Sequence, residues 1–193
     1  MLSISNAESV DVGDRILAAA ASCVRDFGAD RVTVAEIARR AGVSRPTVYR
    51  RWPDTQTLLA SLLTDRVTGT WQEVAHRGNG RAALVARIVA VAQRLRRDDL
   101  ILTILGSAPE LAMVYITGRL GTSQQILIDL VADELRKCQA DNTVRGGDPR
   151  QLAAMLLLIT QSVIQSGQIV EPILGTKALA AELSHALNGY LEP

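Results

Sequence analysis

Residues 33–52 read Thr-Val-Ala-Glu-Ile-Ala-Arg-Arg-Ala-Gly-Val-Ser-Arg-Pro-Thr-Val-Tyr-Arg-Arg-Trp. Thr33 can cap a helix, because its hydroxyl can accept from unpaired backbone amides, and Glu36 has the spacing of the second half of a capping box. Gly42 follows Ala41 and can adopt the left-handed conformation that a sharp turn between helices requires. These residues predict a short helix that ends at Ala41, followed by a tight turn.

A second short helix is predicted to begin after Ser44, which is a favoured capping residue. Pro46 fits the first turn of that helix, where a backbone N–H has no intrahelical partner. At about 100° per residue, Val48 and Trp52 share one side with the apolar stripe of the first helix, so that side is predicted to be core. The other side chains then point outward or lie at the edges of the outward face: Arg45, Pro46, Thr47, Tyr49, Arg50 and Arg51.

This helix pair is also the basic part of the chain. Residues 31–51 contain six arginines and one acid, a local net charge of +5, whereas the whole chain has a net charge of +1. A solvated helix pair with arginine outside is one interpretation. The order of cap, glycine turn, second cap, proline and outward arginine favours a helix-turn-helix that binds the major groove of DNA. DNA contacts are therefore predicted at Thr33, Ser44, Arg45, Pro46, Thr47, Tyr49, Arg50 and Arg51.

The pattern Thr-x-x-x-Ile-Ala-x-x-Ala-Gly-Val-Ser-x-x-Thr-x-Tyr-x-x-Trp-Pro occupies residues 33–53. It resembles the DNA-binding domain of the tetracycline-repressor-like (TetR) regulators, in which Phe is more common at the position of Trp52. With the helix before it and residues 53–63 after it, the match covers roughly the first third of the chain. The resemblance implies a homodimeric repressor that a small ligand releases from a pseudo-palindromic operator.

Composition limits the remaining possibilities. The chain has 193 residues, of which 48% are hydrophobic and 21% charged, which is typical of a globular protein with one small and one larger domain. Residues 1–10 lack the features of a secretory signal, and no apolar stretch approaches the ~20 residues of a membrane helix. Two widely separated cysteines, Cys23 and Cys138, favour a reducing cytoplasm. We therefore expect a cytoplasmic protein with no membrane partner.

Helical spacing continues through the rest of the chain without convincing strand alternation. The sequence predicts an all-α fold with a three-helix DNA-binding domain at 1–59 and a larger helical domain for ligand binding and dimerisation at 60–193. A first helix is expected over Asp14–Phe27, and a long fourth helix from Pro53 toward Arg77 joins the two domains. Further helices are expected at about 81–97, 99–105, 109–117, 122–140, 148–168 and 176–191.

The predicted helix at 148–168 has apolar residues on nearly every side. One subunit can cover one or two of its faces. A partner subunit related by a two-fold axis can cover the rest, together with Ile126, Leu127, Leu130 and Leu135. The alternative is a central helix buried within a single subunit.

An effector pocket is predicted from apolar residues that ordinary core packing would also explain. Its lining residues are predicted to include Trp71, Leu102, Leu105, Met113 and Tyr115. Because these residues offer scarcely any ion partners, the ligand is expected to be small and apolar. No cofactor is predicted.

A second function is compatible with the sequence. Glu73-Val-Ala-His76 and Glu182-Leu-Ser-His185 are Glu-x-x-His pairs on predicted helices, and two such pairs with two further glutamates form the di-iron site of ferritin-like enzymes. Glu36 and Glu134 would have to supply those glutamates. The capping role of Glu36 and the helix-end position of His76 argue against this site. No nucleotide-binding loop, zinc spacing or paired nucleophile and base is present, so an enzyme is not expected.

Overall fold

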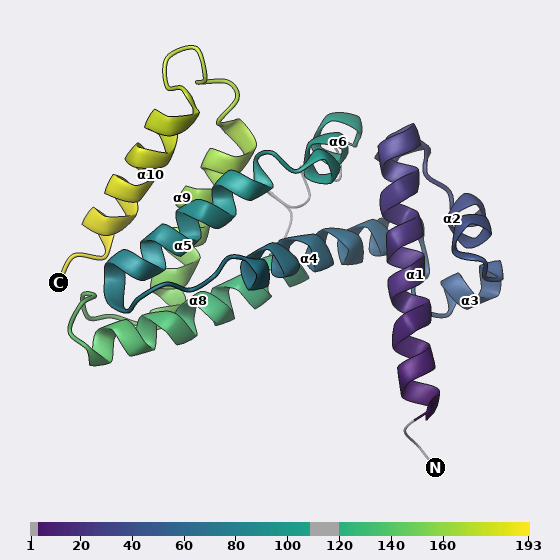
Figure 1. The fold of residues 1–193 in the computed structure, drawn as a ribbon, viewed down its shortest axis with the longest axis horizontal. Coiled ribbons are helices and arrows are strands. Elements are labelled where there is room, and N and C mark those ends of the chain that lie inside the picture. The colour runs from purple at the N-terminus through teal and green to yellow at the C-terminus, as the bar shows by residue number, and fades with distance from the viewer. Residues whose placement is uncertain (1–3, 109–119) are drawn as a thin grey trace. The chain divides into compact units, whose positions relative to one another are not determined.

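All regular structure in the described residues is helical, as the sequence predicts. The computed structural model describes residues 4–108 and 120–193. In chain order its helices are α1 (Ile4–Phe27), the short 3-10 helix η1 (Ala29–Arg31), α2 (Val34–Ala41), α3 (Arg45–Tyr49), α4 (Thr55–Glu73), α5 (Gly80–Leu95), α6 (Asp99–Ser107), α8 (Thr122–Ala140), α9 (Pro149–Ser166) and α10 (Thr176–Tyr190) (Figure 1).

The chain divides into two compact units. The first contains α1, η1, α2, α3, α4 as far as Arg66, and α6. The second contains the remainder of α4 with α5, α8, α9 and α10. The sequence predicts one continuous second domain at 60–193, whereas the compact units group α6 with the N-terminal helices.

Apolar packing explains the position of α6. Leu100 and Ile104 are 3% and 1% exposed, within a core built by α1, α2, α3 and the first half of α4. At the end of α6, the Ser107 Oγ accepts a hydrogen bond of 2.7 Å from the backbone N–H of Ala29. Helix α6 is therefore an integral part of the first unit, which local sequence patterns could not predict.

Helix α1 is longer than expected. It begins at Ile4 instead of Asp14 and continues through Gly13, where a side chain would collide with the guanidinium of Arg51. Cys23 of this helix is buried, and burial raises the pKa of its thiol.

Helix α9 is the centre of the second unit, where it contacts α5, α8 and α10. Leu152 and Leu156 are buried, but Met155 is 41% and Leu158 62% exposed. The interpretation in which one subunit buries this helix on every side is therefore wrong for the structure described. An apolar face of α9 is left for another surface to cover.

Helix α4 is shorter than expected, because it begins at Thr55 and ends at Glu73. Its start is fixed by Asp54, whose Oδ1 accepts from the N–H of Thr57 at 2.6 Å, and this bond lowers the pKa of the carboxyl group. At its other end Arg87 donates to the carbonyl of Trp71 at 2.8 Å, a group in the last turn with no partner inside the helix. The rise of the helix is roughly 28 Å instead of ~36 Å.

The remaining predicted boundaries agree within a few residues, and α8 begins and ends where expected. The predicted helix at 109–117 lies outside the described residues. None of the helices described combines the length and apolar character needed to cross a membrane.

Candidate DNA-binding site

Helix α2 is terminated at both ends by the predicted residues. The Thr33 Oγ1 accepts from the N–H of Glu36 at 3.3 Å, and Gly42 has φ 64° and ψ 38°. A further contact stabilises the turn, since Arg15 of α1 donates to the carbonyl of Ala41 at 2.6 Å. Arg15 was not predicted, because its place beside the turn depends on how α1 packs and not on local sequence.

Helix α3 is anchored by one side and exposed on the other. The Ser44 Oγ accepts from the N–H of Thr47 at 3.3 Å, which confirms the cap. Val48 is fully buried, and the adjoining Trp52 is 8% exposed with its Nε1 donating to the Ser61 Oγ at 2.9 Å. By contrast, exposure is high for Ser44, Arg45, Pro46, Tyr49 and Arg50, and intermediate for Thr47 and Arg51.

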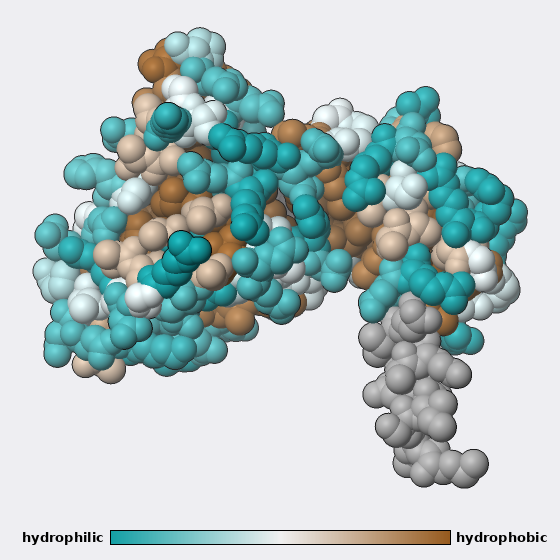
Figure 2. Space-filling model, viewed as in Figure 1, coloured by the Kyte–Doolittle hydropathy of each residue, from teal (hydrophilic) through white to brown (hydrophobic). Residues whose placement is uncertain are grey.

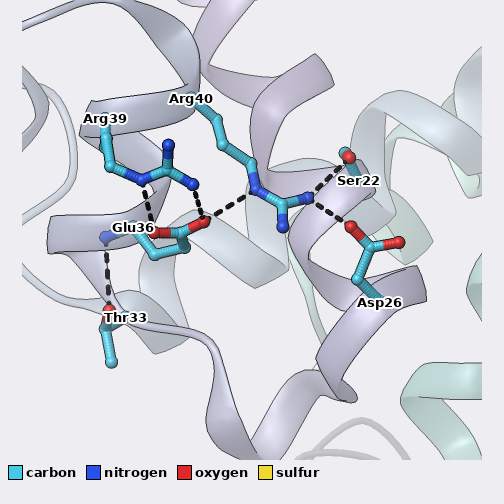
Figure 3. A network of polar contacts seen from close by, with 6 residues as sticks. All are labelled: Ser22, Asp26, Thr33, Glu36, Arg39 and Arg40. Carbon is cyan, nitrogen blue, oxygen red and sulfur yellow. Dashed lines mark hydrogen bonds and ion pairs between the residues drawn. The ribbon is translucent and has the colours of Figure 1, made fainter.

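The predicted capping box is only half correct, because Glu36 uses its carboxylate elsewhere. It accepts from Arg39 at 2.6 and 2.8 Å and from Arg40 at 2.9 Å. Arg40 then reaches back to α1, where it donates to the Ser22 Oγ at 2.8 Å and pairs with Asp26 at 2.5 Å (Figure 3). Its guanidinium also lies 4.8 Å from the centre of the Phe27 ring.

This network changes the charge available for DNA. The sequence count of +5 includes Arg39 and Arg40, but both are paired with Glu36, and Arg40 is paired with Asp26 as well. In contrast, Arg45 and Arg50 are exposed and form no ion pair within the part of the chain described. The basic surface is therefore narrower than the sequence count indicates, because two of its six arginines are paired with acids in the described structure.

The network also predicts a pH dependence of stability. Hydrogen bonds from Arg39 and Arg40 lower the pKa of Glu36 from 4.5 to about 2. The unfolded chain takes up this proton near the ordinary pKa, so the contribution of Glu36 is complete above about pH 4.5 and is lost as pH falls toward 2. We expect Glu36→Gln to flatten the fall in unfolding free energy over this range, measured by urea denaturation. Glu192→Gln, at an exposed position, is the control. An unchanged slope in Glu36→Gln would contradict the role of the network.

Arg51 is less exposed than Arg45 and Arg50. Its guanidinium passes over Gly13 of α1, and the residue is half-buried. This placement suits a cation that contacts the DNA backbone from the edge of α3. We expect Arg51→Ala to weaken binding to all duplexes alike and to reduce the salt slope by about one, as loss of one phosphate contact would. Anisotropy titrations over several salt concentrations measure this, and a loss confined to one DNA sequence would contradict it.

The residues predicted for the effector pocket are divided between the two compact units and the residues that the structure does not describe. Trp71 is buried in the second unit, while Leu102 and Leu105 are half-buried on α6 in the first unit. Met113 and Tyr115 lie outside the described residues. The predicted pocket therefore stays a prediction.

The glutamates and histidines proposed for a di-iron site do not form a metal site in the described residues. His76 Nε2 lies 3.8 Å from Glu134 Oε2, but Glu134 also accepts from Lys137 at 2.9 Å. Glu36 is paired with arginines in the other unit. Within the described residues, no group of three or more His, Cys, Asp or Glu side chains is arranged to hold a metal ion.

Comparison with known proteins agrees with the geometry of α2 and α3. The family described as "Bacterial regulatory proteins, tetR family" matches residues 16–62. Uncharacterised HTH-type transcriptional regulators of Mycobacterium bovis and Mycobacterium tuberculosis are each 62% identical over 191 residues, which is 99% of this chain and 100% of theirs.

A solved structure extends the likeness to the whole fold. The transcriptional repressor QsdR of Rhodococcus erythropolis, from the TetR family, superposes with a TM-score of 0.69 at 18% identity, over 94% of this chain and 96% of its own. Nothing in the comparisons favours the ferritin-like alternative. The chain therefore belongs to the TetR family of bacterial HTH-type transcriptional regulators, and it is a DNA-binding regulator and not an enzyme.

Proposed function

We propose that this regulator is a homodimeric repressor that binds a pseudo-palindromic operator and is released by a small ligand. Helix α3 enters the major groove, and Arg45 and Arg50 read base edges while Thr33, Ser44, Tyr49 and Arg51 position the helix on the backbone. Pro46 and Thr47 lie against the bases. Two copies of α3 have to sit about 34–36 Å apart, or a multiple of one DNA turn, to reach successive grooves. We place this action in the cytoplasm, where bacterial DNA lies.

The observation that carries the proposal is the asymmetry of α3. Its five residues are fixed to the core by Val48, which is fully buried, and by capping at Ser44. Nearly every other side chain in or beside the helix is exposed, and two of these are arginines without an ion pair in the described structure. A fixed backbone with unpaired donors on one face suits the recognition of base edges, because little backbone order has to be gained on binding.

The exposed apolar face of α9 supports dimerisation. Met155 and Leu158 lie one turn apart on this helix, and Ile126 on the adjoining α8 is 37% exposed. A two-fold axis that places this face against its own copy would bury all three side chains twice. We propose that residues 1–59 bind DNA and that residues 60–193 form the dimer and bind the ligand.

For the effector we propose a small apolar molecule bound among Trp71, Leu102, Leu105, Met113 and Tyr115. Helix α4 would transmit its effect, because this single helix contributes residues to both compact units. Only a ligand with different affinities for the two spacings of α3 can shift the protein between them. The charge-poor character of these five residues is what supports an apolar ligand.

Fluorescence anisotropy on the duplex upstream of the protein's own gene tests the function directly. We expect tight binding that resists excess random duplex and weakens steeply as salt is raised. Equal affinity for the upstream and random duplexes over several salt concentrations would contradict sequence-specific regulation at that site. Failure to bind either duplex at low salt would contradict the assignment of α3 as a recognition helix.

A further inference from the structure

A shallow groove lies on the second unit between the end of α4 and one face of α5. Its volume is about 370 Å³, near the lower limit for small-molecule sites. Ala83, Ala86 and Ala90 recur at helical spacing along α5 and form its apolar floor. In Figure 2 the second unit carries pale brown surface crossed by dark teal, strongly hydrophilic side chains. The groove thus combines small apolar residues with long polar ones.

The polar residues of the groove are mostly cationic. Arg77, Arg87 and Arg94 line it, and Glu73 is the one acid among the lining residues. Glu73 lies 3.4 Å from Arg94, with both side chains more than half exposed, so this pair is a weak one. Neither Arg77 nor Arg87 pairs with a carboxylate in the part of the chain that the structure describes. The lining therefore has an excess of two positive charges.

Arg87 is held in place although no carboxylate of the described residues forms an ion pair with it. Its guanidinium lies 4.1 Å from the centre of the Trp71 ring and donates to the carbonyl of Trp71 at 2.8 Å. Its Nε is enclosed by protein and has no hydrogen-bond partner. A partly desolvated cation without a counter-ion is unfavourable, and a negative charge in the groove would offset part of that cost electrostatically. Because the side chain is already ordered, little entropy is lost when it binds one.

We propose that this groove binds a small amphiphilic carboxylate. Its carboxylate group meets Arg87 and Arg94, since a guanidinium matches the planar geometry of a carboxylate. Its short alkyl chain covers the alanine floor, which spans about two turns of α5. The site goes beyond the function proposed above. Its lining residues differ from those of the apolar effector pocket, and its ligand is an anion and not an uncharged apolar molecule.

Hexanoate is a suitable probe, with hexanamide as its uncharged match. Trp71 lies against Arg87, so its fluorescence responds to binding in the groove, and Trp52→Phe removes the signal of the other tryptophan. Because Trp71 is also placed in the effector pocket, the groove variants below assign the change to one site. We expect a saturable change with hexanoate and none with hexanamide. Calorimetric titration of the unaltered protein gives the same comparison if Trp52→Phe is unstable. Equal responses to both compounds, or no saturable response to hexanoate, would overturn the proposal.

Three variants separate the groove from general charge effects. Arg87→Gln should raise the dissociation constant of hexanoate about tenfold, the loss of roughly one charge-assisted contact. Ala86→Leu keeps every arginine but fills the floor, and it should weaken binding similarly. Arg97→Gln removes the same charge at an exposed position outside the groove and should leave the constant nearly unchanged. If Arg87→Gln and Ala86→Leu bind hexanoate as tightly as the unaltered protein does, this site is excluded. Operator binding, measured by anisotropy, independently checks that each variant is folded.

Discussion

Arg45→Ala and Arg50→Ala are each expected to lower the preference for operator over random DNA by about 1–3 kcal/mol, or roughly 5- to 150-fold. Both side chains are exposed and neither forms an ion pair in the described structure. Removing them should therefore leave the fold of α3 intact, since Val48 and the Ser44 cap hold that helix. The loss should appear on the operator and hardly at all on random duplex.

Arg39→Ala is the matched control for this experiment. Arg39 belongs to the same helix pair and its side chain is 70% exposed, but its guanidinium is paired with Glu36. Its removal should change operator preference far less than either α3 substitution does. Competition titrations with operator and random duplex at fixed salt give the measurement. Equal loss on both duplexes for Arg45→Ala and Arg50→Ala would show that these arginines contact phosphates only.

Leu158→Arg is expected to abolish the dimer and, with it, tight operator binding. Leu158 is 62% exposed in the single chain, at the middle of the apolar face of α9. At an interface with two-fold symmetry the substitution introduces two charges, one from each subunit, into a surface that would otherwise be apolar. A central interface side chain of this kind contributes about 2 kcal/mol or more per subunit. The two copies together give about 4 kcal/mol, so we expect roughly a thousandfold loss of dimer affinity.

Sedimentation of the variant measures the oligomeric state, and anisotropy measures operator binding in the same samples. Ala82→Arg places the same side chain on an exposed position of α5 and should remain dimeric. A Leu158→Arg protein that is still dimeric and binds the operator normally would show that the subunits meet through some other surface.

Local chemistry made the helix-turn-helix predictable. Thr33 and Ser44 are short hydroxyl side chains at the starts of helices, and Gly42 is needed where φ is positive. Each of these requirements involves residues within three or four positions of one another, so the sequence alone contains the relevant information. The buried faces of α2 and α3 follow from spacing in the same way, as Ile37 and Val48 show.

Contacts between distant residues were not predictable by that reasoning. Arg40 bonds Asp26, fourteen residues earlier, and Ser107 accepts from Ala29, 78 residues earlier. Glu36 has the correct spacing for a capping box, yet two nearby arginines compete successfully for its carboxylate. The selection of the effector residues rested on hydrophobicity, which plain core packing also explains, so the effector pocket stays a prediction.

The position of α6 also bears on how such proteins can be recombined. A fragment ending near residue 66 would lack Leu100 and Ile104, leaving a hole in its core, and would lose the hydroxyl that Ala29 donates to. A chimera that joins this DNA-binding segment to a relative's sensor domain therefore inherits a foreign α6 against native α1. The DNA-binding unit of this regulator is therefore discontinuous in sequence. A successful exchange has to include α6 together with α1, α2, α3 and the first half of α4.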